Sequence, residues 1–129
     1  MKSLIIPEGN YTPYISFDAD TQVFEIAGES YSEYTLDFFE PVLRWLSTYL
    51  EQNREPVTFN FRMNYFNTST SRRFFEILKI LEDFYYKQNG FVQVNWYAKS
   101  NDLDMIESGE DYQEDFITLP FNILVQKVP

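Results

Sequence analysis

Two segments of the chain have the hydrophobic spacing of long amphipathic helices, and each lies between runs with the alternation of β-strands. The first segment spans residues 34–52, and the second follows the hydroxyl-rich segment 68–71 and ends at about Gln88. Apolar residues recur in both at intervals of three and four. They are Phe38, Phe39, Val42, Leu46, Tyr49 and Leu50 in the first segment, and Phe74, Ile77, Leu78, Leu81, Phe84 and Tyr85 in the second.

Short strands are expected before, between and after these helices. Residues 14–18 and 23–27, joined by the polar A-D-T-Q, predict a hairpin. Residues 57–64 alternate apolar and polar side chains, which predicts a strand whose polar face is partly exposed. Residues 91–97 and 121–125 predict two more strands.

The expected order is hairpin, helix, strand, helix, strand, short helix, strand, where the short helix is the weak acidic segment 102–112. Two strand–helix–strand crossovers favour parallel pairing. We therefore predict the α/β class, with a mixed β-sheet that opens with a hairpin and is covered mainly on one face by helices. A length of 129 residues fits a single domain over 1–129.

Pro41 leaves two interpretations of the first helix. Proline removes one helical hydrogen bond, so the main helix either begins near Glu40 with Pro41 in its first turn or is longer and kinks there. The second helix has a clear end, because Asn89-Gly90 is a typical C-terminal stop.

Charge and composition exclude several function classes. The formal net charge is -10 and the pI is about 4.3, which disfavours binding to nucleic acid or an anionic membrane surface. The chain has no Cys and no His, so thiol and imidazole nucleophiles and the usual zinc ligands are absent. The N-terminal segment M-K-S-L-I-I-P-E-G is too short for a signal-peptide core, and we expect a cytoplasmic protein.

Four consecutive hydroxyl residues, at 68–71, precede the second helix and are followed by Arg72 and Arg73. One interpretation is structural, since hydroxyl side chains commonly cap the free N–H groups of a helix N-terminus. The other is phosphorylation. A phosphate here would gain about 0.3–1 kcal/mol from the helix terminus, and both arginines could add charge-assisted contacts. One residue suffices as a cap, which leaves the other hydroxyls free to be exposed.

The acidic residues of segment 102–115 do not form a recognisable ligand set. A calcium loop starting at Asp102 would need a ligand and then glycine where the chain has Ile106 and Glu107. No carboxylate pair is marked out for acid–base catalysis, and the four glycines form no phosphate-binding loop. We predict no catalytic residue, no metal and no cofactor.

Several runs resemble the SiaC family of bacterial regulatory phosphoproteins. They are T-P-Y-I-S-F-D, G-E-S-Y-S-E-Y-T-L-D-F-F-E-P-V-L-R-W-L, Y-F-N-T-S-T-S-R-R and G-E-D-Y-Q-E-D, and they extend through nearly the whole chain. The resemblance implies a STAS-like fold and a non-enzymatic switch. A partner kinase would phosphorylate the threonine of the N-T-S motif, a PP2C-type phosphatase would remove the phosphate, and the unphosphorylated form would bind and regulate an effector such as a diguanylate cyclase.

Carried onto this chain, the resemblance makes Thr68 the phosphorylated residue, with Asn67 and Ser69 completing the motif. Ser69, Thr70, Ser71, Arg72 and Arg73 would form its surroundings.

The chain departs from the family pattern in one loop. The family often has S-Y-P-E-N where this chain has S-Y-S-E-Y. We treat Tyr31, Ser32, Glu33 and Tyr34 as a candidate partner-contact loop, and if this loop contacts a partner, the departure leaves the identity of that partner open. Two alternatives remain open: a constitutive scaffold module in which the hydroxyls only cap the helix, and a carboxylate enzyme.

Overall fold

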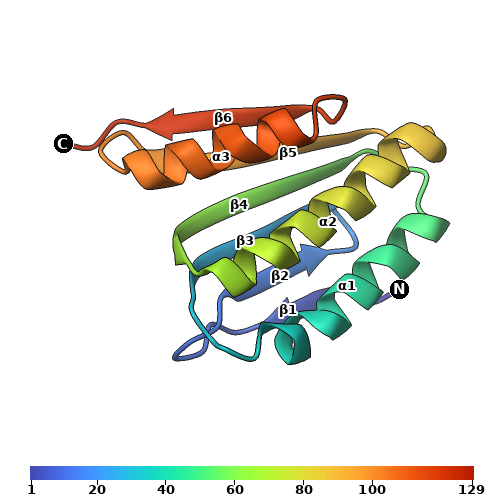
Figure 1. Ribbon diagram of the computed structural model, residues 1–129. Coiled ribbons are helices and arrows are strands. Elements are labelled where there is room, and N and C mark those ends of the chain that lie inside the picture. Colours follow the sequence, from blue (N-terminus) through green and yellow to red (C-terminus); the bar gives the residue numbers. More distant parts are fainter.

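The protein, described here by a computed structural model of residues 1–129, has one six-stranded sheet and three helices (Figure 1). The strands are β1 (Leu4–Ile6), β2 (Tyr14–Asp18), β3 (Val23–Ser30), β4 (Val57–Phe66), β5 (Val92–Lys99) and β6 (Phe121–Gln126). The helices are α1 (Thr35–Gln52), α2 (Thr68–Lys87) and α3 (Leu103–Asp115). The strand order in space is the order in the chain, and none of the helices is long and apolar enough to cross a membrane.

Because the strand order is sequential, all three helices lie on one face of the sheet. The β1–β2 and β2–β3 pairs are antiparallel, and the β3–β4, β4–β5 and β5–β6 pairs are parallel. The three parallel crossovers step in the same direction, and right-handed crossovers then place their helices on the same side. Figure 1 shows this arrangement. The predicted α/β class, mixed sheet, opening hairpin and one-sided cover are confirmed.

The structure differs from the sequence prediction in one strand, in the number of parallel crossovers and in the start of the first helix. Leu4–Ile6 forms the edge strand β1, which is too short to show a periodic pattern. The acidic helix α3 makes a third parallel crossover where only two were expected. Helix α1 is continuous from Thr35, so the interpretation that it begins near Glu40 is wrong. Pro41 is exposed and lies in the second turn, where the loss of one hydrogen bond is tolerated.

Trp96 joins the sheet to the helices. Its ring is completely buried, with the rings of Phe61 and Tyr112 at 5.1 and 5.4 Å, and its Nε1 donates a hydrogen bond to Met105 O at 2.9 Å. Gly109 of α3 lies against the same ring, because a Cβ built there would come within 2.5 Å of Trp96 Cδ1. Helix α3 can approach β5 this closely only because residue 109 has no side chain.

The opposite face of the sheet is polar and carries no helix. Asn60, Asn95 and Asn122 lie in register across β4, β5 and β6. Asn95 Nδ2 donates to Asn60 Oδ1 at 3.0 Å, and Asn122 Nδ2 donates to Asn95 Oδ1 at 3.3 Å. These hydrogen bonds give partners to side-chain amide groups of Asn60 and Asn95, which are buried in the sheet.

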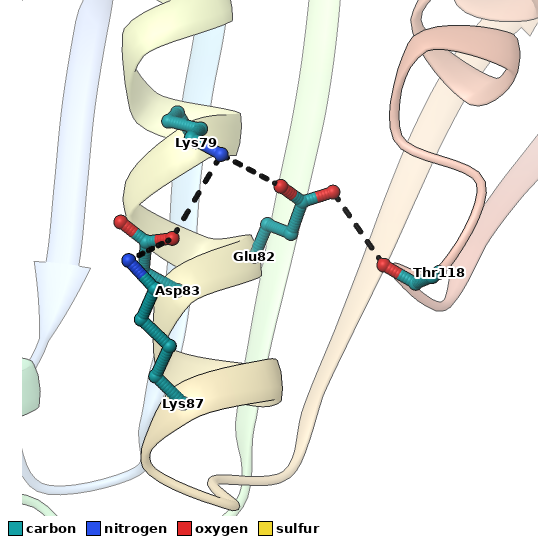
Figure 2. A network of polar contacts seen from close by, with 5 residues as sticks. All are labelled: Lys79, Glu82, Asp83, Lys87 and Thr118. Carbon is teal, nitrogen blue, oxygen red and sulfur yellow. Dashed lines mark hydrogen bonds and ion pairs between the residues drawn. The ribbon is translucent and has the colours of Figure 1, made fainter.

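Ion pairs occupy the solvent-exposed side of α2 (Figure 2). Lys79 Nζ lies 3.1 Å from Glu82 Oε1 and 3.9 Å from Asp83 Oδ1, and Lys87 Nζ lies 3.6 Å from Asp83 Oδ1. The hydrogen bond from Lys79 to Glu82, with the charges of Glu82 and Asp83, raises the pKa of Lys79. Thr118 Oγ1 also donates to Glu82, at 3.5 Å, so the network connects the loop after α3 with α2.

We predict that Gly109→Ala destabilises the protein, although alanine ordinarily improves a helix by about 1 kcal/mol over glycine. The added methyl group would overlap the Trp96 ring, and overpacking in a core costs about 1–3 kcal/mol. Urea unfolding monitored by tryptophan fluorescence measures the change. Glu110→Ala, at the exposed neighbouring position, is the control and should lie within about 0.5 kcal/mol of wild type. A stabilised Gly109→Ala protein would contradict this packing.

Candidate functional site

A β-bulge at the end of β4 sets the position of the first turn of α2. Gly28 pairs with Met63 but Glu29 pairs with Tyr65, so Asn64 is an extra residue in β4. Gly28 has a φ of 101°, which glycine adopts far more readily than other residues. After the bulge Phe66 turns toward the helix layer and packs at 5.0 Å from the ring of Phe74. Helix α2 therefore begins directly over the carboxyl end of β4.

Asn67 is the N-cap of α2. Its backbone is extended (φ -89°, ψ 177°), and its Oδ1 accepts a hydrogen bond from Thr70 N at 2.9 Å. Its Nδ2 donates to Ser32 O at 3.2 Å, and its backbone N donates to Ser30 O at 3.0 Å. One amide side chain thus caps the helix and holds the loop after β3, so the structural interpretation, in which a hydroxyl of 68–71 caps the helix, is wrong. Asparagine is a preferred N-cap residue, so the sequence contained this signal.

Three of the four hydroxyls bond to other elements of the fold. Ser69 shares a hydrogen bond with the Thr35 hydroxyl at the start of α1. The side chain of Thr70 is fully buried, and its Oγ1 forms a hydrogen bond of 2.7 Å with Ser30 Oγ at the end of β3.

Ser71 makes the third connection, to α3. Its Oγ lies 2.9 Å from the Tyr112 hydroxyl, which donates a hydrogen bond to Ser71 O at 2.8 Å. The first turn of α2 is therefore fixed to β3, α1 and α3.

Thr68 is the exception. It is the first residue of α2, its side chain is exposed, and its hydroxyl makes no hydrogen bond within the protein. It lies at the rim of a groove of about 300 Å³ between α2 and α3, which is also lined by Arg72, Phe75, Asp111, Tyr112 and Asp115. Of the four hydroxyl residues, Thr68 is the exposed one, whereas Ser69 and Ser71 are half-buried and Thr70 is fully buried.

The two arginines have different surroundings. Arg73 Nε lies 2.8 Å from Glu76 Oε1 and the side chain is 17% exposed, so its charge is already compensated. Arg72 is exposed, forms no ion pair within 4.0 Å, and lies four residues after Thr68, which places it on the same side of the helix. Arg72 is thus the free cation beside the Thr68 hydroxyl, while Asp111 and Asp115 lie across the groove.

The loop 31–34 lies next to this turn and is largely exposed. Ser32 Oγ accepts from Tyr34 N at 3.0 Å, which shapes the loop, and Asn67 holds it through Ser32 O. The ring of Tyr31 lies 5.4 Å from that of Tyr11 and 6.1 Å from that of Tyr65. This exposed tyrosine cluster includes two residues, Tyr11 and Tyr65, that the sequence analysis did not select. The three tyrosines are 20 or more residues apart in the chain, so no local sequence pattern indicates that they form a cluster.

The acidic residues of 102–115 are dispersed around α3. Nowhere in the structure do three or more Asp or Glu side chains gather so that they could hold a metal ion. Asp102 has a structural role, because its Oδ1 accepts from Met105 N at 3.1 Å and caps α3.

Burial raises the pKa of Tyr112 to about 12, and the charges of Asp115 and Asp111 act in the same direction. The raised pKa keeps the phenol protonated, and its hydroxyl can donate to Ser71 O at all physiological pH values.

Comparisons with known proteins give a consistent result. The model of a family described as "SiaC family regulatory phosphoprotein" matches residues 6–126. An uncharacterized protein of Pseudomonas aeruginosa (strain UCBPP-PA14) is 30% identical over 124 residues, which are 95% of this chain and 96% of that protein.

Solved structures from the same organism are also similar. Apo-SiaC of P. aeruginosa superposes with a TM-score of 0.86 at 27% identity, over 98% of this chain and 99% of that one. A second similar structure is the diguanylate cyclase SiaD in complex with its activator SiaC, also from P. aeruginosa. The match has a TM-score of 0.85 at 26% identity, over 97% of this chain and 99% of the matched chain.

We predict that Tyr112→Phe lowers the free energy of unfolding at neutral pH by about 1–2 kcal/mol, because it removes the hydroxyl that bonds to Ser71. Folding raises the pKa of Tyr112 above its value in the unfolded chain, which is about 10. The protonated hydroxyl therefore contributes fully to the free energy of unfolding below pH 10. This contribution is lost as pH rises toward 12.

The difference between wild type and Tyr112→Phe should therefore shrink between pH 10 and 12. Chemical unfolding of both proteins across this range measures it. A difference that stays constant through the range would contradict the assignment. The exposed Tyr86→Phe is the control and should match wild type throughout.

Proposed function

The chain belongs to the SiaC family of regulatory phosphoproteins, and we propose that it is a non-enzymatic switch that is reversibly phosphorylated on Thr68. A partner kinase transfers the terminal phosphoryl group of a nucleoside triphosphate to Thr68 Oγ1, which loses its proton as the diphosphate leaves. A PP2C-type phosphatase then hydrolyses the ester with water and releases inorganic phosphate. In the unphosphorylated form the protein binds and regulates an effector.

The observation that carries this proposal is the isolation of the Thr68 hydroxyl. Its neighbours Ser69, Thr70 and Ser71 are engaged with other elements, and Asn67 caps the helix, so the Thr68 hydroxyl has no structural role. It is exposed at the N-terminus of a 20-residue helix, where the dipole and free N–H groups favour an anion. A phosphate of about -1.5 to -2 charges would be stabilised here.

Arg72 is the residue that we expect to hold the phosphate. It lies one helical turn from Thr68 and has no other ionic partner. Arg73 supports the helix through Glu76. Asp111 and Asp115 across the groove would repel the dianion and so direct it toward Arg72.

The effector is proposed by analogy with the relatives. SiaC of P. aeruginosa is the activator in a complex with the diguanylate cyclase SiaD, and we propose a diguanylate cyclase as the effector class here. The surface around Thr68 includes the loop 31–34 and the exposed tyrosine cluster, and aromatic residues are enriched at binding hot spots. A dianion at its centre would change both its charge and its shape.

The scaffold alternative has weaker support. In the scaffold alternative the hydroxyls of 68–71 only cap the helix, but Asn67 caps the helix in the structure. A constitutive binding module would not need an exposed threonine beside a free arginine.

Phosphopeptide analysis of the protein isolated from its native cells should place the phosphate on Thr68. The neighbouring peptide positions Ser69, Thr70 and Ser71 should be unmodified, because their oxygens are bonded to Thr35, Ser30 and Tyr112. Fragmentation by electron transfer separates the four positions. A phosphate found mainly on Thr70 would contradict the site, since that side chain is fully buried.

Substitutions at Thr68 test the switch itself. Thr68→Glu should weaken binding to the effector at least tenfold, or about 1.4 kcal/mol, because it puts a charge on the docking surface. Thr68→Val removes the hydroxyl, keeps the shape and adds no charge, so its affinity should stay within about threefold of wild type. Isothermal titration with the diguanylate cyclase of the native organism measures both. If wild type and Thr68→Glu bind the effector with equal affinity, the result favours the alternative in which the protein is a constitutive scaffold.

A further inference from the structure

The edge strand β6 is open to another strand, in contrast to the edge at the other side of the sheet. Proteins usually protect sheet edges with charges, proline or very short strands. Strand β1 has three residues and is followed by Pro7, which protects that edge. Strand β6 has six residues, F-N-I-L-V-Q, with no charge and no proline, and Leu124 and Val125 are 38% and 52% exposed.

The backbone of β6 has hydrogen-bonding groups that point away from the sheet. Pro120 O and Gln126 O accept bonds from Val94 N and Ser100 N, so these positions face β5. Residues between them alternate in direction, which turns the N–H and C=O groups of Ile123 and Val125 outward. Phe121 O, which points the same way, accepts from Gln113 Nε2 at 2.9 Å. The outward groups of Ile123 and Val125 have no partner in the protein and are available to a further strand.

We propose that β6 pairs antiparallel with β6 of a second copy of this chain. A two-fold axis perpendicular to the sheet makes the contact self-complementary and closed. With Leu124 at the axis, Ile123 of each copy faces Val125 of the other, and the outward groups of both residues become paired. The two Leu124 side chains meet on the open face, and the result is a continuous sheet with the helices of both copies on one side.

Charge favours a second copy as the occupant of this edge. The chain carries -10 overall, but β6 carries none and Lys127 follows it directly. Gln113 bonds to Phe121, so the last turn of α3, with Glu114 and Asp115, lies beside the start of β6. In the antiparallel arrangement Lys127 approaches the start of β6 of the other copy, and opposite charges meet twice. Salt of 0.15 M screens the remaining repulsion beyond about 8 Å.

Sedimentation equilibrium of the full-length protein at 0.15 M salt, from micromolar to millimolar concentration, tests the proposal. Wild type should show a reversible monomer–dimer equilibrium. Val125→Pro removes an outward N–H without removing a bond to β5 and should raise the dimer dissociation constant at least tenfold. Val125→Thr keeps the N–H and the branched shape, and its dissociation constant should stay within about threefold of wild type.

A wild-type protein that stays monomeric throughout the range overturns the proposal, as does a dimer that Val125→Pro leaves unchanged. Circular dichroism verifies that Val125→Pro is folded. If it is not, Leu124→Glu replaces it, since that change puts like charges together at the axis and should also abolish the dimer. The proposal is independent of the switch, because Thr68→Glu should dimerise like wild type, so failure of either idea leaves the other standing.

Discussion

The hydrogen bonds that fix the first turn of α2 are the constraint on which the candidate site depends. Asn67 caps the helix and holds the loop 31–34, while Ser69, Thr70 and Ser71 bond to α1, β3 and α3. Every polar side chain of residues 67–71 is thereby hydrogen-bonded within the protein, except the Thr68 hydroxyl. A rigid turn with one free oxygen has a defined place for a phosphate, which a flexible serine-rich loop would lack.

The same hydrogen bonds would let the proposed switch work without a rearrangement of the fold. The chain is already strongly acidic, so two more negative charges matter through their position rather than through the total. A phosphate on Thr68, as proposed, would lie beside one free cation, Arg72, and opposite two carboxylates, Asp111 and Asp115. Binding of a partner over this surface would have to accommodate a dianion at its centre, and differences of about 1.4 kcal/mol change an affinity tenfold.

The sequential strand order has a second consequence, because it leaves the sheet with an uncovered face and two edges. The uncovered face is made polar by the asparagine row, with Asn60 and Asn95 bonded to each other. One edge is the short β1 and the other is the uncharged β6. Thr68 and the edge strand β6 belong to different elements, although Asp115 of α3 lines the groove at Thr68 and also lies near the start of β6. In the two proposals, the surface at Thr68 would serve regulation and the edge at β6 would serve self-association.

The sequence by itself determined most of the elements and indicated where to look for a candidate site. Helical and alternating periodicity identified α1, α2 and the longer strands, because each buries one face against a common core. The hydroxyl run and the N-T-S motif pointed to the start of α2, and Asn67 as the cap could have been inferred from residue preference. Strand β1 was missed because three residues show no period.

Only the tertiary structure decided which oxygen is free. The partners of Thr70, Ser69 and Ser71 lie 40, 34 and 41 residues away in the chain, and no local pattern encodes such distances. The same holds for the tyrosine cluster, for the close approach of Gly109 to Trp96, and for β6 as an edge. Periodicity reports which side of an element is apolar, whereas exposure of a single polar atom depends on what long-range packing brings against it.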